Sequence, residues 1–186
     1  MLIRLQAALL RPLILLVIIL WVLSLQQTVS ASPFGQGVFG AHVPFGSATS
    51  LSIALGGNVS LSLTPSGGNF TGSGSHTITV ISTDVVGYSL YVYSPSGTTM
   101  TNGSATIPAS TNTTAGPLSV NSWGYNTDAS SNYLGMTTTP VLLKSASGPY
   151  ETGDNTAVTY GVLTDITKAA GSYTVSVTYT GVATNE

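Results

Sequence analysis

From residue 50 onward, apolar side chains occupy every second position in one segment after another. Residues 51–55 and 59–63 each alternate apolar residues with serine or alanine, and two glycines and an asparagine at 56–58 separate them. A period of two is the signature of a half-buried β-strand, and a Gly- and Asn-bearing step between two such runs is typical of a hairpin. The pattern therefore predicts a β-hairpin over residues 51–63.

The same alternation continues to the end of the chain, with turn-forming residues at intervals near ten. Further strands are expected at residues 77–83, 87–94, 105–107, 118–125, 137–144, 157–164 and 172–180. Clean alternation favours antiparallel pairing, because strands of parallel sheets are continuous apolar runs. We expect an all-β fold, an antiparallel β-sandwich of the Ig-like or Greek-key type with seven to nine strands.

The first 31 residues have a different pattern. Arg4 and Arg11 precede an apolar run over residues 12–25, and a short polar stretch ends at Ala31. A basic start, an apolar centre and small residues before the end are the features of a secretory signal peptide. We predict cleavage between Ala31 and Ser32, with an uncleaved membrane-anchor helix as the alternative.

The predicted organisation has three parts. Residues 1–31 form the signal peptide or anchor, residues 32–48 a Gly-, Pro- and Phe-bearing segment, and residues 49–186 the β-sandwich domain. The middle segment is expected either to lie in a groove of the domain or to contact another subunit. Membrane contact is expected only through residues 1–31.

Charge is scarce, at 5% of the residues, against about 25% in an average soluble protein. Beyond residue 31, two lysines accompany six acidic residues, so the net charge of that part is −4. Such a surface does not neutralise phosphates, so we expect no nucleic-acid partner. The chain has no cysteine, which excludes thiol catalysis and thiolate metal sites. No cofactor is indicated.

Four aromatic residues are candidates for binding carbohydrate by stacking, namely Trp123, Tyr125, Tyr91 and Tyr93. Aromatic faces suit the apolar faces of sugar rings, and cell-wall polymers are rich in such rings. The alternative is that Trp123 anchors the core, as a tryptophan in the middle of a sandwich usually does. The Trp–Gly–Tyr step at 123–125 is interpreted as a bulge or a strand end.

Few titratable residues suggest chemistry. Glu151 and Asp154 lie in a Gly-bearing stretch, 148–155, and are a weak candidate for Ca²⁺, with an ordinary turn as the alternative. His42 and His76 belong to no hydrolase motif, so the protein is expected not to be an enzyme. Lys144 is interpreted as a strand-end lysine, with a covalent cross-link to an asparagine as the alternative.

Three segments, at residues 86–92, 121–125 and 170–180, resemble WxL-like cell-wall surface proteins and related exported bacterial β-sandwich domains. The resemblance implies a secreted or cell-surface protein, without enzymatic activity, that binds a cell-wall polymer or other surface proteins. The chain has Trp–Gly–Tyr where that family has Trp–x–Leu, so no binding residues are transferred. The alternatives are a fimbria-like subunit that self-assembles by strand addition through residues 32–46, and a carbohydrate-active enzyme.

Overall fold

The computed structural model describes residues 49–184, and within that range the regular structure is entirely β. No helix in this part of the chain is long and apolar enough to cross a membrane. The predicted signal or anchor, its cleavage site and the segment 32–48 lie outside the described residues. The strands are β1 (Ser50–Leu55), β2 (Thr64–Ser66), β3 (Asn69–Thr83), β4 (Gly87–Tyr93), β5 (Met100–Asn102), β6 (Ala105–Ile107), β7 (Ser122–Asn126), β8 (Val141–Ser147), β9 (Tyr150–Asp165) and β10 (Thr178–Thr184).

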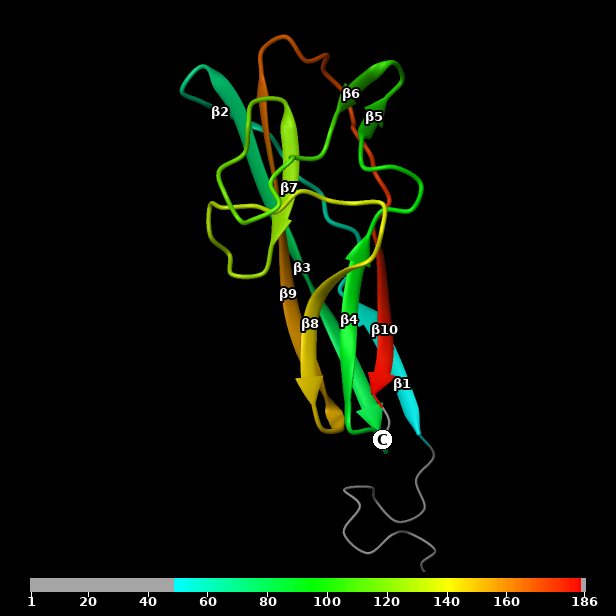
Figure 1. Cartoon of the computed structure of the whole chain (residues 1–186). Helices are drawn as coiled ribbons and strands as arrows, with labels where there is room; N and C mark the ends of the chain where they lie inside the picture. The colour runs from blue at the N-terminus through cyan, green and yellow to red at the C-terminus, as the bar shows by residue number, and fades with distance from the viewer. Residues whose placement is uncertain (1–48, 185–186) are drawn as a thin grey trace, which may run out of the picture. The chain divides into compact units, whose positions relative to one another are not determined.

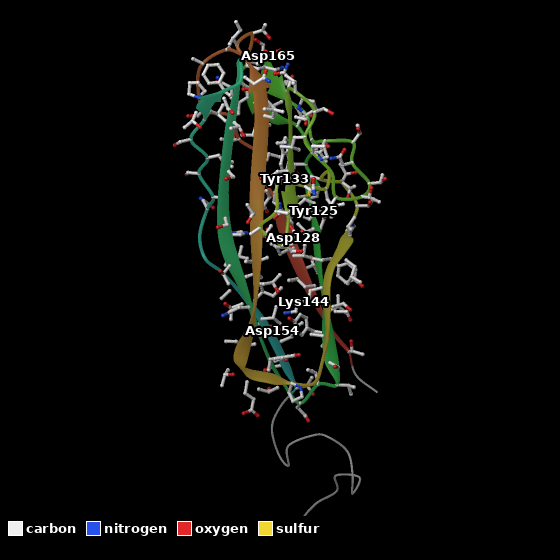
Figure 2. The ribbon with its side chains drawn as sticks, turned by 90° about the vertical axis from the view of Figure 1, so that its left-hand side faces the viewer. Tyr125, Asp128, Tyr133, Lys144, Asp154 and Asp165 are labelled. Atoms are coloured by element: carbon white, nitrogen blue, oxygen red, sulfur yellow. The ribbon has the colours of Figure 1, made fainter. Side chains whose placement is uncertain are left out.

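The larger strands form two antiparallel sheets, which confirms the predicted all-β, antiparallel fold (Figure 1). The first sheet has the order β1-β3-β9-β7, with β2 also paired to β3, and the second has the order β10-β4-β8. Figure 2 shows the two sheets as separate layers with side chains between them. A small hairpin, β5-β6, completes the set.

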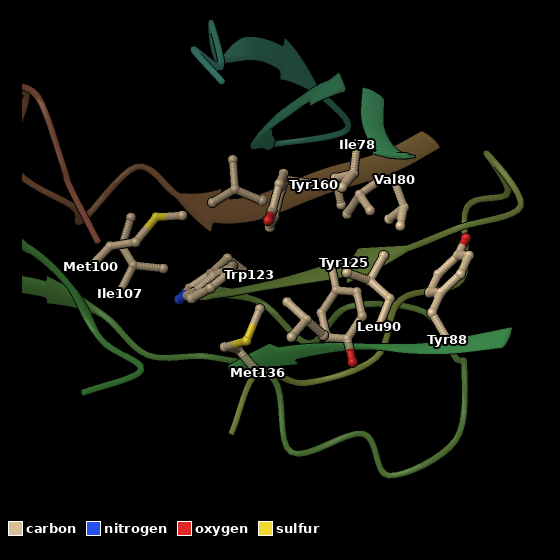
Figure 3. Close-up of a cluster of buried hydrophobic side chains, with 13 residues drawn as sticks. Ile78, Val80, Tyr88, Leu90, Met100, Ile107, Trp123, Tyr125, Met136 and Tyr160 are labelled. Atoms are coloured by element: carbon tan, nitrogen blue, oxygen red, sulfur yellow. The ribbon is translucent and has the colours of Figure 1, made fainter. Parts of the chain in front are cut away.

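The core lies between the two layers and consists of the alternate side chains that point inward (Figure 3). On β4, Tyr88, Leu90 and Val92 are buried, while the residues between them are only half-buried. The full buried cluster comprises Ile78, Val80, Tyr88, Leu90, Val92, Met100, Ile107, Trp123, Tyr125, Met136, Val158, Tyr160 and Val162. Period-two alternation thus marks the core-facing side of β4.

The predicted hairpin over residues 51–63 is wrong. β1 pairs with the far end of β3, with Leu51 opposite Ser82, and residues 56–63 form no strand. Residues 59–63 instead run close over β3 at Gly72 and Gly74, where a Cβ on Gly72 would lie 2.7 Å from the Ser62 carbonyl oxygen. The absence of side chains at these glycines is what admits the segment.

Several strand boundaries also differ from those predicted. β3 and β9 pair from Asn69–Asp165 to Ser82–Tyr150, so both strands begin well before the predicted starts at residues 77 and 157. Long cross-strand pairing overrides the weak strand preference of glycine and serine in these stretches. β8 and β10 begin later than expected, and ten strands replace seven to nine because short pieces such as β2 and β5 give no periodic signal.

Residues 123–125, interpreted as a bulge or a strand end, contain no bulge, since β7 pairs with β9 in unbroken register from Ser122 to Asn126, and the strand ends one residue past Tyr125. The opposite edge of β7 is covered by loop segments. Ser110 donates its backbone N–H to the Trp123 carbonyl, and Tyr125 and Leu134 exchange backbone hydrogen bonds. β7 is therefore held on both sides, and its aromatic residues point into the core.

Candidate functional site

The outer face of the β10-β4-β8 sheet carries a cluster of aromatic and apolar side chains. Residues directly opposite each other in an antiparallel pair point to the same side of the sheet. The register places Tyr91 opposite Thr180 on one neighbour and opposite Leu142 on the other, and places Tyr93 opposite Thr178. We call the set Tyr91, Tyr93, Leu142, Thr178, Thr180 and Val182 the β4 tyrosine face.

The two tyrosines belong to this face because of the alternation within β4. Their neighbours Leu90 and Val92 fill the core, so residues 91 and 93 must point outward. Alternate residues of a strand are about 6.6–6.8 Å apart, so the two rings lie in a row along the central strand. The neighbouring apolar side chains remain open to solvent, with Leu142 53% and Val182 51% exposed.

The β4 tyrosine face contains no charged side chain. Lys144, the nearest basic residue along β8, is opposite Leu90 and therefore points inward. A β-bulge at Leu143 shifts the β8 register and sends Lys144 to the core side. Within the described residues, the hydroxyl groups of Tyr91 and Tyr93 have no hydrogen-bond partner, so they are available to a ligand.

Lys144 forms an ion pair with Asp154, at 2.6 Å between Nζ and Oδ1 (Figure 2). The other carboxylate oxygen accepts a hydrogen bond from the Tyr88 hydroxyl at 2.7 Å. Burial alone would raise the pKa of Asp154, but the hydrogen bonds from Lys144 and Tyr88 outweigh it and lower that pKa. Burial and Asp154 together raise the pKa of Tyr88. Lys144 thus lies in the middle of β8 and forms an ion pair on the inner side of the sheet, so the interpretation as a strand-end lysine is wrong.

This arrangement gives the calcium candidate no support. Glu151 and Asp154 both lie within β9, and Asp154 is already neutralised by Lys144. In the described part of the chain, no group of three or more His, Cys, Asp or Glu residues is arranged to hold a metal. Residues 150–155 belong to β9, which pairs with β3, so they do not form the turn that was the alternative interpretation.

Trp123 and Tyr125 do not belong to the candidate face, contrary to the predicted four-residue platform. Trp123 is 0% and Tyr125 3% exposed, so neither ring offers a surface to a sugar. The Trp123 indole N–H donates to the Thr98 carbonyl oxygen at 2.9 Å, and its ring lies 6.2 Å from that of Tyr160. Trp123 is a core anchor, which was the alternative interpretation.

His76 is engaged in a hydrogen-bonded chain between the sheets. The Gly57 carbonyl can only accept, so Nδ1 of His76 carries a proton, and Nε2 is hydrogen-bonded to the Tyr179 hydroxyl at 2.9 Å. Tyr160 is bonded to Tyr179 in turn. Burial raises the pKa of Tyr160 to about 12 and also raises the pKa of Tyr179, so both stay protonated at neutral pH. This hydrogen-bonded chain links β3, β9 and β10, and none of its three side chains is an activated nucleophile exposed to solvent.

The sequence identified only two members of the β4 tyrosine face. Leu142, Thr178, Thr180 and Val182 join it through pairings of β4 with residues 51 to 93 positions later in the chain. Alternation could have assigned each residue to one side of its own strand. It carries no information on which strands become neighbours, so the cluster was not visible in the sequence.

Comparison of the chain with protein-family models, curated proteins and solved structures found no match in any of the three. The resemblance to WxL-like surface proteins stays a prediction.

Proposed function

We propose that this protein is an exported cell-surface protein with a sandwich domain of the Ig-like or Greek-key type. In this proposal it binds a neutral, hydroxyl-rich polymer of the cell envelope and catalyses no reaction. The observation that carries the proposal is the row of two outward tyrosines, Tyr91 and Tyr93, on the central strand of an uncharged sheet face. The basic and apolar pattern of residues 1–31 supports export.

The chemistry of the face suits a sugar polymer. Tyrosine combines an apolar ring with a polar hydroxyl, so it packs against a ring face while hydrogen-bonding at its edge. Thr178 and Thr180 add hydroxyl groups on one side, and Leu142 adds apolar surface on the other. A face without charge has no electrostatic preference for an acidic or basic ligand, which favours an uncharged one.

Binding is tested by co-sedimentation of the purified full chain with isolated peptidoglycan whose carboxyl and amino groups have been chemically capped, so that the polymer is uncharged. The double substitution Tyr91→Thr/Tyr93→Thr removes both rings and keeps good strand-forming residues. We expect affinity to fall by about 10- to 100-fold. Removing each ring should cost roughly half of the free energy gained by burying a large apolar side chain. The matched variant Tyr91→Phe/Tyr93→Phe keeps the rings and should retain most of the affinity.

Salt provides a second readout. Stacking on an uncharged face should be nearly insensitive to ionic strength, whereas binding to charged polymers weakens as salt screens it. Equal binding by wild type and the Tyr91→Thr/Tyr93→Thr variant, or loss of binding at high salt, would reject the β4 tyrosine face as the binding site.

Export is tested by fractionating the producing cells and sequencing the N-terminus of the protein in each fraction. Ser32 as the first residue in the wall or medium would support cleavage after Ala31. Met1 retained in the membrane fraction would support the anchored alternative. Recovery in the cytoplasm alone would reject export.

A further inference from the structure

The edges of the two sheets are protected to different degrees. An unpaired strand edge is a template for pairing with another chain, and proteins usually block it with charges, bulges or covering loops. The β7 edge is covered through the hydrogen bonds at Trp123 and Tyr125. The β8 edge carries both a bulge and an inward-pointing charge, Lys144.

β1 has none of these protections. Its six residues, Ser50–Leu55, include no charge and no proline. Within residues 49–184, nothing hydrogen-bonds to the edge of β1 that faces away from β3. The strand is nonetheless held firmly, because its inward side chains pack over β10, where a Cβ on Gly181 would lie 2.9 Å from Ile53 Cδ1. Among residues 49–184, β1 is therefore an edge strand with no pairing partner on its outer side.

We propose that β1 pairs with the β1 strand of a second copy of this chain, so that two copies share one continuous sheet. The pairing is antiparallel about a two-fold axis, which is the usual symmetry of a homodimer. This inference is independent of the proposed polymer binding, because β1 and the β4 tyrosine face belong to different sheets.

The alternation of β1 restricts the register, and the register centred on Ile53 is the allowed one that pairs Leu51 with Leu55. Opposed residues must point to the same side, so inward residues must meet inward residues across the axis. With Ile53 on the axis, Leu51 of one copy lies opposite Leu55 of the other, and Ser52 lies opposite Ala54. All inward pairs are then apolar, and Leu55, which is 53% exposed in the single chain, becomes covered. No like charges meet anywhere along the new pair.

A second copy fits this edge because β1 is complementary to itself in that register. Pairing through the segment 32–46 instead would be a head-to-tail exchange, which produces open chains of many copies. Pairing of β1 with β1 uses the same edge on both copies and stops at two. The size of the assembly therefore distinguishes the two modes.

The register is tested with single cysteines, since the natural chain has none. Ser52→Cys and Ala54→Cys are made separately in the full chain, mixed after purification and oxidised. The mixture should give a disulfide-linked dimer on a non-reducing gel, because the two sulfurs then lie on directly opposed residues. Each variant alone should not, since the diagonal distance of about 7–8 Å exceeds what a disulfide spans. A mixture of Ser73→Cys and Ser75→Cys, which lie on the interior strand β3, is the matched control and should stay monomeric.

Sedimentation velocity of the full chain in mild detergent gives the second measurement. Wild type should convert from monomer to dimer as its concentration rises. Ser52→Lys/Ala54→Lys places lysines opposite lysines and should weaken the dimer by about tenfold or more. Ser73→Lys/Ser75→Lys adds the same charge away from the edge and should dimerise like wild type. A wild type that stays monomeric, a ladder of larger species, or unimpaired dimerisation of the Ser52→Lys/Ala54→Lys variant would each overturn the proposal.

Discussion

Replacing Trp123 with phenylalanine tests whether this residue anchors the core. Its ring is 0% exposed, and its N–H is bonded to the Thr98 carbonyl oxygen at 2.9 Å. Phenylalanine keeps an aromatic ring but removes the donor and part of the volume. The substitution therefore leaves one carbonyl without its partner and opens a cavity beside Tyr160, whose ring lies 6.2 Å away.

Both effects lower the free energy of unfolding. An unsatisfied buried acceptor costs about 1–3 kcal/mol, and loss of buried volume adds to it, so we expect a total of about 2–4 kcal/mol. Equilibrium urea unfolding followed by far-UV circular dichroism measures the change, because the substitution removes the tryptophan that fluorescence would report. With a slope of about 1–3 kcal/mol per molar urea, the midpoint should fall by roughly 1–2 M.

The Tyr91→Thr substitution is the control, because it removes an aromatic ring from the outer face of β4. It should change the unfolding free energy by about 1 kcal/mol or less, the range of strand preferences at a half-exposed site. The Trp123→Phe variant should bind peptidoglycan like wild type once folded. A loss of under about 0.5 kcal/mol for Trp123→Phe, the size of an ordinary surface change, would refute the core assignment.

Two further predictions concern β9. The pKa of Asp154 is lowered in the folded state, so the stability it contributes is complete above its ordinary value of 3.8 and is lost as pH falls through the lower folded value. Asp154→Asn should lower the free energy of unfolding by about 1.5–3 kcal/mol at pH 7. It should also make that free energy depend less on pH below pH 4. An unchanged acid-unfolding curve would contradict the ion pair with Lys144. Gly161→Ala should destabilise the fold by about 1–3 kcal/mol, because the added Cβ would meet the Tyr133 ring. Thermal unfolding measures the loss, and adding Tyr133→Ala should relieve the clash. An unchanged unfolding temperature for Gly161→Ala would contradict this packing.

The sequence indicated the fold class well because alternation is a local property. Within β4, the pattern of residues 87–94 predicted the strand and put Tyr88, Leu90 and Val92 on one side of it, and the structure shows that this side faces the core. The same pattern placed Tyr91 and Tyr93 on the opposite side. These assignments need only the geometry of a single strand.

Strand pairing joins residues far apart in the sequence, and the predicted partner of residues 51–55 was wrong. Residues 51–55 and 59–63 look like a hairpin, yet β1 pairs with residues 78–83. Gly72 and Gly74 of β3 have no side chains, so residues 59–63 can lie directly against the β3 backbone. This role of the two glycines is apparent only from the folded structure. The ion pair of Lys144 with Asp154 depends likewise on a bulge that turns the lysine inward.

The sequence by itself determined that the domain is built of antiparallel strands, that its surface is nearly uncharged, and which side of most strands is apolar. Tertiary structure alone decided which strands became neighbours. It placed Trp123 in the core, brought Leu142 and Thr180 beside Tyr91, and left β1 as an unprotected edge. The physical reason is that alternation sets the side to which a residue points, whereas neighbours are chosen by the burial and hydrogen bonding of the whole chain at once.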